Sequence, residues 1–343
     1  MYTAVADGSR PVCISSLRNR PEDVHYSAPR MNAIKDIALD GVFIAIIAHG
    51  LIGISLIWDK VLLKSPGTKN LLSYVFWLGA ISIFGLVLIP FGFKMPPWKL
   101  AGMGFSAGLL DLIASYFYYS ALKSGEASEE LAIMGGFAPV ATALIAIPLL
   151  REPVGGQMAG FTVMTLGGFV MFFAEKQPLK KMLPKIVLAS VGFGLMNVLQ
   201  KIVFDHTNFV SGYVFFTLGT FAGSIALLVP SSWRHQIFEH SDEATPTSKF
   251  WYMMNRFVAG VGSFLIIFAI SRTNPALVEA ISGVRYIIIF LGAYAITQVK
   301  PSWFREDFRK PVLIAKVTAT CLVVIGLVLV ALSGGGGGAS GPQ

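Results

Sequence analysis

Ten apolar stretches of about 20 residues dominate the sequence, and they restrict the fold more than any other feature. An α-helix rises about 1.5 Å per residue, so roughly 20 apolar residues cross a hydrocarbon core about 30 Å thick. In lipid each unpaired backbone group costs several kcal/mol, which favours uninterrupted helices, and the alternating pattern of barrel strands does not occur. We therefore expect an all-α membrane protein with about ten transmembrane helices.

The boundaries of these helices follow from the apolar stretches. The expected spans are Gly41–Leu62, Leu71–Phe93, Leu100–Leu122, Leu131–Leu150, Gln157–Ala174, Ile186–Phe204, Phe209–Pro230, Phe250–Ile270, Pro275–Thr297 and Val312–Leu332. The longest connections, 175–185 and 231–249, mix charges with prolines, so we predict solvated loops there. A polar N-terminal tail, 1–35, precedes the first span, and a flexible Gly-rich tail, 334–343, follows the last.

Composition indicates lipid rather than water as the solvent. Hydrophobic residues make up 54% of the chain and charged residues 13%, which is more apolar surface than one aqueous domain buries. The net charge is +8, but the basic residues are spread over short connections, so lipid headgroups explain them better than a nucleic acid does. Cys13 and Cys321 match no metal-ligand spacing, and we expect neither a metal nor a cofactor. We predict a multi-pass protein of the plasma (inner) membrane.

The two halves of the sequence resemble one another. The segment Tyr74–Trp77 is echoed by Tyr213–Phe216, and residues 121–153 align without a gap on residues 269–301. Lys60 and Lys201 precede the second span of each half. The pattern predicts a first repeat over residues 36–178, with spans 1–5, and a second over residues 179–333, with spans 6–10.

A repeat of five helices crosses the membrane an odd number of times, so its second copy enters from the opposite side. We therefore predict inverted repeats. Such folds commonly bind their substrate near the bilayer midplane, where the halves meet, and expose it alternately to the two sides.

The first repeat resembles a known family. The segments Ser120–Leu122, Gly136–Leu144 and Leu149–Pro153 look like the EamA-type repeat of the drug/metabolite transporter (DMT) superfamily. That repeat has a proline-bearing fourth helix ending in a glutamate and then a Gly-rich fifth helix; the matching residues are Pro139, Glu152, Gly160, Gly167 and Gly168. The second half departs from the pattern, with Ile287 for the proline and Lys300 for the glutamate. The resemblance implies two inverted repeats and transport of small polar or amphipathic metabolites, often by exchange or proton coupling.

Two arguments about orientation disagree. Basic residues are more frequent after odd-numbered spans, which by the positive-inside rule puts both termini outside the cytoplasm. Proteins of the family that the sequence resembles usually keep both termini inside. The orientation therefore stays open.

An ionisable residue at membrane depth costs a few kcal/mol and usually marks function. Asp111 lies near the middle of the third span and shares a small, polar helix face with Ser115 and Tyr118. This face fits a cavity wall, with Asp111, Ser115, Tyr118 and Tyr119 as substrate-binding candidates. Close helix packing with a structural hydrogen bond from Asp111 is the alternative.

The ninth span supplies the facing candidates. Arg285 lies near its middle, with Ser282 one turn earlier, Tyr286 beside it and Glu279 nearer the end. We predict that Arg285 faces Asp111 across the midplane, either as a charge pair that breaks on binding or as a cation for an anionic substrate. A permanent structural ion pair is the alternative.

Four residues are gate or hinge candidates. Lys60 and Lys201 occupy matching positions near the ends of the first and sixth spans, and Arg256 lies at shallow depth in the eighth. Each of these long side chains could instead simply extend to the interface. Pro139 could hinge the fourth helix or simply pack.

No catalytic motif accompanies these residues, because the sequence contains no nucleophile elbow, zinc-binding histidine motif or phosphate loop in a suitable context. We predict a secondary transporter rather than an enzyme. Its partners would be a small-molecule substrate, the lipid bilayer and a coupling proton, carried by Asp111, or a counter-substrate, in a monomer or homodimer. A lipid or lipid-linked sugar flippase and a non-transporting membrane subunit are the alternatives.

Overall fold

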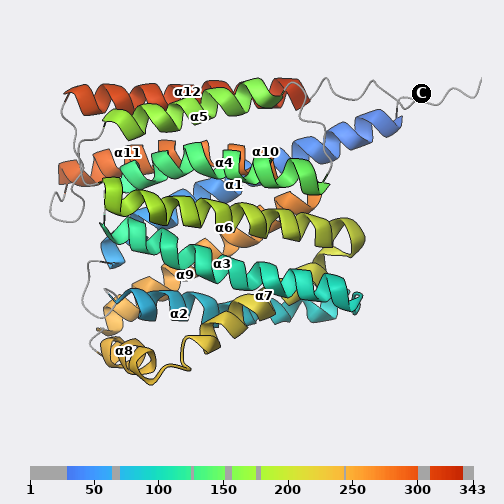
Figure 1. The fold of residues 1–343 in the computed structure, drawn as a ribbon, viewed down its shortest axis with the longest axis vertical. Coiled ribbons are helices and arrows are strands. Elements are labelled where there is room, and N and C mark those ends of the chain that lie inside the picture. The colour runs from blue at the N-terminus through green and yellow to red at the C-terminus, as the bar shows by residue number, and fades with distance from the viewer. Residues whose placement is uncertain are drawn as a thin grey trace, which may run out of the picture.

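The computed structural model describes residues 29–63, 70–124, 127–150, 157–174, 179–242, 245–299 and 310–334. Within these ranges every regular element is a helix, and the long helices lie side by side in one bundle (Figure 1). α5 and α12 form one edge of the bundle. α2, α7 and α8 lie at the opposite edge, with α3, α4 and α6 between them.

The elements follow one another along the chain with short connections. Their bounds are α1 (Pro29–Leu62), α2 (Leu71–Ile81), η1 (Ser82–Phe91), α3 (Trp98–Ser124), α4 (Ala127–Leu150), α5 (Gln157–Ala174), α6 (Leu179–His206), α7 (Phe209–Ala226), α8 (Ser231–Asp242), α9 (Pro246–Arg272), α10 (Pro275–Ala280), α11 (Gly283–Val299) and α12 (Lys310–Gly334), where η1 is a 3₁₀ helix.

Seven helical segments in the described part of the chain are long and apolar enough to cross a membrane. They are Gly41–Leu62, Leu71–Phe91, Trp98–Lys123, Met182–His206, Phe209–Ala226, Pro246–Arg272 and Pro275–Gln298. Each coincides within a few residues with a predicted span, so the protein is an all-helical, multi-pass integral membrane protein. The other three predicted spans are helical as well, in α4, α5 and α12.

Side-chain caps explain where several helices begin. Asn70 precedes α2 and accepts a hydrogen bond from the backbone N–H of Ser73, and Asn208 makes the same bond to Ser211 at the start of α7. Thr245 caps α9 in this way, and Asn274 caps α10. Each cap satisfies a backbone donor that the first turn of a helix leaves without a partner.

Two predicted spans are not uninterrupted α-helices, contrary to expectation. The second changes from α2 to the 3₁₀ helix η1 at Ser82, whose Oγ donates to the carbonyl oxygens of Gly79 and Thr217 at 2.6 and 3.1 Å. η1 ends at Gly92, whose φ of 110° is accessible to glycine at little cost. The ninth span breaks between α10 and α11, after Ala280. Apolar character indicates that a segment can cross the membrane, but it does not determine whether the segment is a continuous α-helix.

The two predicted loops are also partly helical. Residues 231–242 form α8, because Ile237 is fully buried and Phe238 packs edge-on against Phe76 of α2 with ring centroids 5.9 Å apart. α6 begins at Leu179, within the other predicted loop, and α1 begins at Pro29, within the predicted polar tail. The Gly-rich stretch after residue 334 lies outside the described residues.

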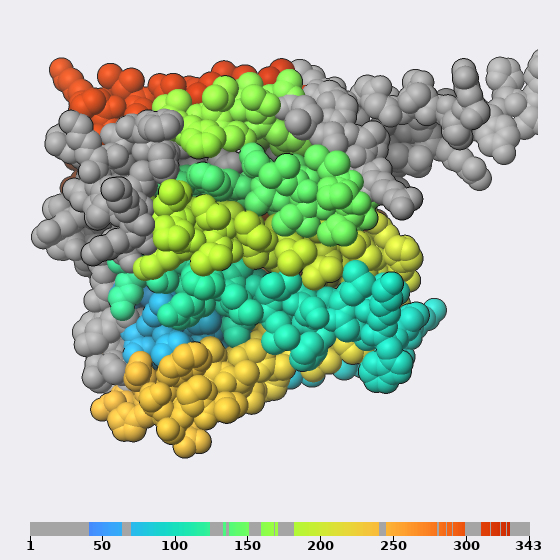
Figure 2. Space-filling model, in the orientation of Figure 1, coloured from blue at the N-terminus to red at the C-terminus, as the bar shows by residue number. Residues whose placement is uncertain are grey.

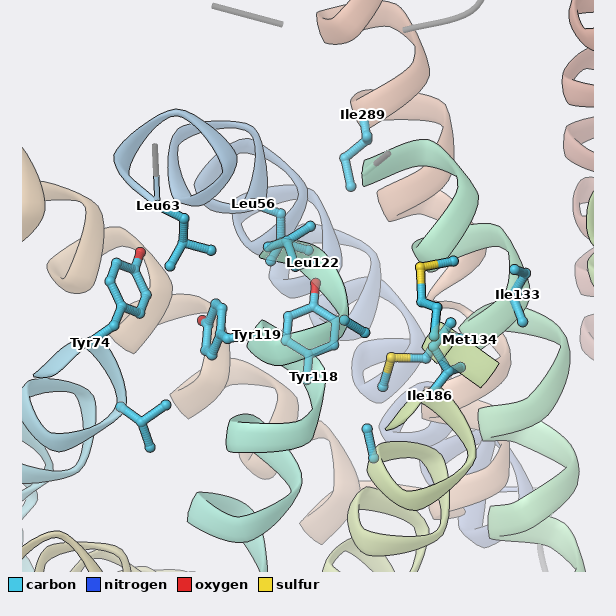
Figure 3. Packing of buried hydrophobic residues seen from close by; sticks show 14 of the residues in the cluster. Leu56, Leu63, Tyr74, Tyr118, Tyr119, Leu122, Ile133, Met134, Ile186 and Ile289 are labelled. Atoms are coloured by element: carbon cyan, nitrogen blue, oxygen red, sulfur yellow. The ribbon is translucent and has the colours of Figure 1, made fainter. Parts of the chain in front are cut away.

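The bundle is held by extensive pairwise packing of helices. α3 packs on α6 and α7, α1 on α9 and α11, α4 on α5 and α6, and α12 on α5. On the face shown in Figure 2, α6 lies between α4 and α3 and packs against both. The largest buried apolar cluster joins α1, α2, α3, α4, α6, α9 and α11, and Figure 3 shows Leu56, Tyr119, Leu122 and Ile186 within it.

Candidate functional site

A buried ion pair lies near one end of the bundle. Asp59 of α1 and Arg256 of α9 form a salt bridge, with their side chains only 1% and 3% exposed. Asn255 also donates its side-chain N–H to Asp59. A buried ion pair needs such extra hydrogen bonds, because removing two charges from water costs several kcal/mol per ion.

Two tyrosines complete this cluster. The hydroxyls of Tyr74 and Tyr119 donate to the two carboxylate oxygens of Asp59, and each accepts a hydrogen bond from the Arg256 guanidinium, at 3.2 and 3.1 Å. Their rings lie next to each other, with centroids 5.1 Å apart (Figure 3). A third ring, that of Tyr252, lies near the guanidinium, and its centroid is 5.6 Å from Cζ of Arg256. We call Asp59, Tyr74, Tyr119, Asn255 and Arg256 the gate cluster.

The position of the gate cluster follows from the helices that supply it. Asp59 lies in the last turn of α1, Tyr74 in the first turn of α2, and Tyr119 near the end of α3. Consecutive antiparallel helices bring these termini to the same end of the bundle. The gate cluster therefore joins four helices, α1, α2, α3 and α9, at that end.

A cavity of about 590 Å³ extends from the gate cluster toward the other end. Most of its lining is apolar, from helices α1, η1, α3, α6, α7 and α9. Its ionisable lining includes three carboxylates and two guanidinium groups: Asp59, Asp111, Glu279, Arg256 and Arg285. Leu88, Tyr213 and Ile267 also line the cavity, on η1, α7 and α9.

Asp111 lines this cavity from the middle of α3. None of the described groups hydrogen-bonds to its carboxylate. Tyr213 of α7 is close enough to Asp111 for the two to interact electrostatically. Asp111 is therefore a carboxylate available to a ligand within the cavity.

The opposite wall holds a second polar group of residues, around the break between α10 and α11. Glu279 accepts a hydrogen bond from the side-chain amide of Asn197 at 2.8 Å. Arg285 donates its Nε–H to Nδ1 of His49 at 2.7 Å, and Nε2 of His49 lies 2.8 Å from the Val278 carbonyl oxygen. This geometry requires the neutral His49 tautomer that carries its proton on Nε2, and His49 thereby fixes the direction of Arg285.

The structure brings most of the predicted substrate residues into one place. Asp111, Ser115, Tyr118, Tyr119, Glu279 and Arg285 all line the cavity. Asp111 and Arg285 form no ion pair in this structure, which was one of the two arrangements predicted for them, and Arg285 donates to His49 instead. Ser282 is buried at the helix break, where its carbonyl accepts a hydrogen bond from the Arg285 backbone N–H. The side chain of Tyr286 lies outside the described residues.

The four gate or hinge candidates differ in their surroundings. Arg256 does not extend to the interface, as a shallow position would allow, because Asp59 holds it in the interior. Lys60 is also buried, and its ammonium donates to the Leu122 carbonyl oxygen. Lys201 does lie at an exposed end, paired with Asp205 at 2.7 Å. Pro139 is buried inside α4, which continues through it without a break.

Sequence reasoning did not select Asp59, although this residue carries the negative charge of the gate cluster. Asp59 stands next to Lys60 at a predicted span end, where a charge is ordinarily solvated. His49 and Asn197 likewise have partners far away in the sequence. An acidic residue in the last turn of an apolar span, in a chain with an arginine inside another span, is the sequence signal that could have marked Asp59 as a candidate.

Comparisons with known proteins support the fold only. No family model and no curated protein matches the sequence. A solved structure described only as a crystal structure of a protein is similar, with a TM-score of 0.58 and 17% sequence identity. The match covers 87% of this chain and 97% of that one. The arrangement of helices is therefore one that also occurs in a solved structure.

Proposed function

We propose that the protein is a secondary transporter that moves a small polar or amphipathic metabolite across its membrane by alternating access. The observation that carries this proposal is a cavity within apolar helices that is lined by several charged side chains and closed at one end by the gate cluster. Its volume lies within the range of about 300–1,000 Å³ that is typical of small-molecule sites. Charges inside membrane helices are expensive and typically mark a pathway for a substrate or ion.

The gate cluster suits the closed end of such a pathway. Its hydrogen bonds all join different helices, and moving α9 away from α1 would break those that Asn255 and Arg256 donate to Asp59. The cavity residues farther along would then be exposed to that side of the membrane. Two discrete arrangements of one set of helices are what alternating access requires.

The proposal includes ten spans in two inverted repeats, and the packing of the helices supports it. A two-fold operation that exchanges α1 with α6, α3 with α9 and α4 with α11 converts the α1–α9 contact into α6–α3 and the α1–α11 contact into α6–α4. All four contacts occur. The identical caps at Asn70 and Asn208 relate α2 to α7 in the same way.

The ends of the chain agree with an even number of crossings. α1 begins at the end of the bundle at which α12 ends (Figure 1). Residues resembling the EamA-type repeat, among them Pro139 within α4, support assigning the chain to the DMT superfamily as part of the same proposal. Glu152, which belongs to that resemblance, lies outside the described residues.

Flux into proteoliposomes tests the transport proposal. Uptake of radiolabelled water-soluble metabolites is compared with movement of labelled lipids, and a pH gradient is imposed in parallel to test proton coupling. Asp111→Asn and Arg285→Gln should each remove a charge-assisted hydrogen bond to the bound substrate, worth about 1.5–3 kcal/mol, so flux should fall at least about tenfold. Arg234→Gln, on the exposed side of α8, should leave flux unchanged.

Two results would contradict the proposal. One is metabolite flux that survives both cavity substitutions. The other is a complete lack of flux by protein that purifies with a partner, which would favour a non-transporting subunit. Lipid movement without metabolite flux would favour a flippase.

A further inference from the structure

The cavity reaches the surface of the bundle between η1 and α9. Phe84 and Val87 of η1 and Phe257 of α9 line the cavity, yet their exposed fractions are 72%, 67% and 67%. Residues that line an interior cavity and also lie on the surface mark its opening. On the α9 side Gly260 lines the cavity too, and a Cβ added there would meet no atom within 4 Å.

The corresponding helix pair on the other side is sealed. α3 and α7 approach so closely that a Cβ on Gly108 would lie 2.0 Å from the Phe216 carbonyl oxygen, and a Cβ on Gly219 would lie 2.0 Å from that of Phe105. Thr220 adds a hydrogen bond to the Gly108 carbonyl at 3.2 Å. The proposed two-fold symmetry between the repeats relates the helix pair α3–α7 to the pair α9–η1. Close packing at glycines therefore closes the first pair, whereas the second pair is open.

The opening lies at the depth of the hydrocarbon core. Phe257 and Gly260 are near the middle of the span Pro246–Arg272, and Phe84 lies well away from both ends of the span Leu71–Phe91. A molecule that enters there comes from the lipid, so part of it must be apolar. The apolar rings that line the path, among them Phe216 and Phe264, suit such a part.

The polar end of the ligand is indicated by the charges inside. Asp111 has no hydrogen-bond partner among the described groups, whereas Asp59 is neutralised by Arg256. Of the remaining lining charges, Asp111 and Glu279 are acidic and Arg285 is basic, so the acidic groups are in excess. A carboxylate among aromatic rings is a favourable site for an ammonium group.

We propose that η1 and α9 form a side portal through which an amphiphilic amine enters the cavity from the bilayer and places its ammonium group on Asp111. This inference rests on the proposed transport function and names its substrate class. The gate cluster then closes one aqueous end while the portal admits the ligand from the lipid.

Binding kinetics in nanodiscs test the portal. The probe is radiolabelled decyltrimethylammonium, measured above its binding to empty nanodiscs. Gly260→Leu and Val87→Trp narrow the portal from opposite sides, and each should slow association at least about tenfold. Gly102→Leu is the matched control, because Gly102 lies on α3 away from the cavity lining and a Cβ added there would also meet no atom within 4 Å.

The head and tail of the probe are tested separately by competition. Tetramethylammonium lacks the tail and decanoate lacks the cation, so each should compete at least about tenfold more weakly than unlabelled probe. Asp111→Asn should raise the Kd of the probe at least about tenfold, the equivalent of about 1.4 kcal/mol.

Unchanged association in both portal variants, or equal competition by tetramethylammonium, would overturn the proposal. Equal competition by decanoate would overturn the amine assignment. The binding assay needs no flux, so the two proposals fail separately. Metabolite flux that is lost in Asp111→Asn but unchanged in Gly260→Leu would refute the portal alone. Probe association that is slowed by the portal substitutions, in a protein that transports no compound, would refute transport alone.

Discussion

Asp59 and Arg256 place opposite charges where neither reaches water. The energetic consequence is asymmetric, because removing one partner leaves the other buried without compensation. The tyrosine hydroxyls of the gate cluster cannot replace a charge, although they satisfy hydrogen bonds. The pair is therefore expected to determine both the stability of the closed end and the energy needed to open it.

A double-mutant cycle measures this coupling. Asp59→Asn and Arg256→Gln should each destabilise the protein by about 3–5 kcal/mol, since each leaves a buried unpaired charge. The double variant should lose clearly less than the sum of the two single losses. The measurement is unfolding of the purified protein in detergent, with additive losses as the result that would contradict it.

The ion pair between Lys201 and Asp205 supplies the control. Their side chains are 15% and 43% exposed, so solvent screens their interaction. Lys201→Gln and Asp205→Asn should each change stability by no more than about 1 kcal/mol. A loss as large as that at Asp59 would show that burial is not the deciding factor.

At the scale of elements, the cavity owes its shape to helices that depart from regularity. η1 rises about 2.0 Å per residue instead of 1.5 Å, and it packs on α7 while leaving the α9 side open. The break between α10 and α11 places Glu279 and Arg285 on either side of it, both toward the cavity. Irregular backbone in a membrane protein is tolerated where it lines a cavity.

The glycines between α3 and α7 give a prediction at this scale. Gly108→Ala and Gly219→Ala should each lower the unfolding temperature, because the added methyl group would overlap a backbone carbonyl that cannot move alone. Gly102→Ala, where the space is open, should be neutral or stabilising by up to about 1 kcal/mol. Thermal unfolding of the three variants in detergent decides it. Equal temperatures for all three would show that the helices separate at little cost.

The whole molecule is expected to be two inverted five-helix units, and its topology can be measured directly. Single cysteines at positions 123, 151 and 206 are introduced after Cys13 and Cys321 have been replaced by serine. A membrane-impermeant maleimide is applied to each side of the membrane in separate experiments. If α4 crosses the membrane, position 123 should be labelled from one side and positions 151 and 206 from the other. Labelling of positions 123 and 151 from the same face would remove α4 from the spans and the inverted repeats with it.

The sequence by itself determined the class of the protein, since long apolar stretches have few stable alternatives to helices in lipid. It also selected Asp111 and Arg285, because a charge in the middle of an apolar span is conspicuous, and Glu279, which lies in the same span as Arg285. Tertiary structure alone decided the partners. The contacts of Asp59 with Arg256 and of His49 with Arg285 join residues roughly two hundred positions apart, and no local pattern encodes which helix faces which. The 3₁₀ form of η1 and the opening beside α9 likewise depend on how neighbouring helices pack.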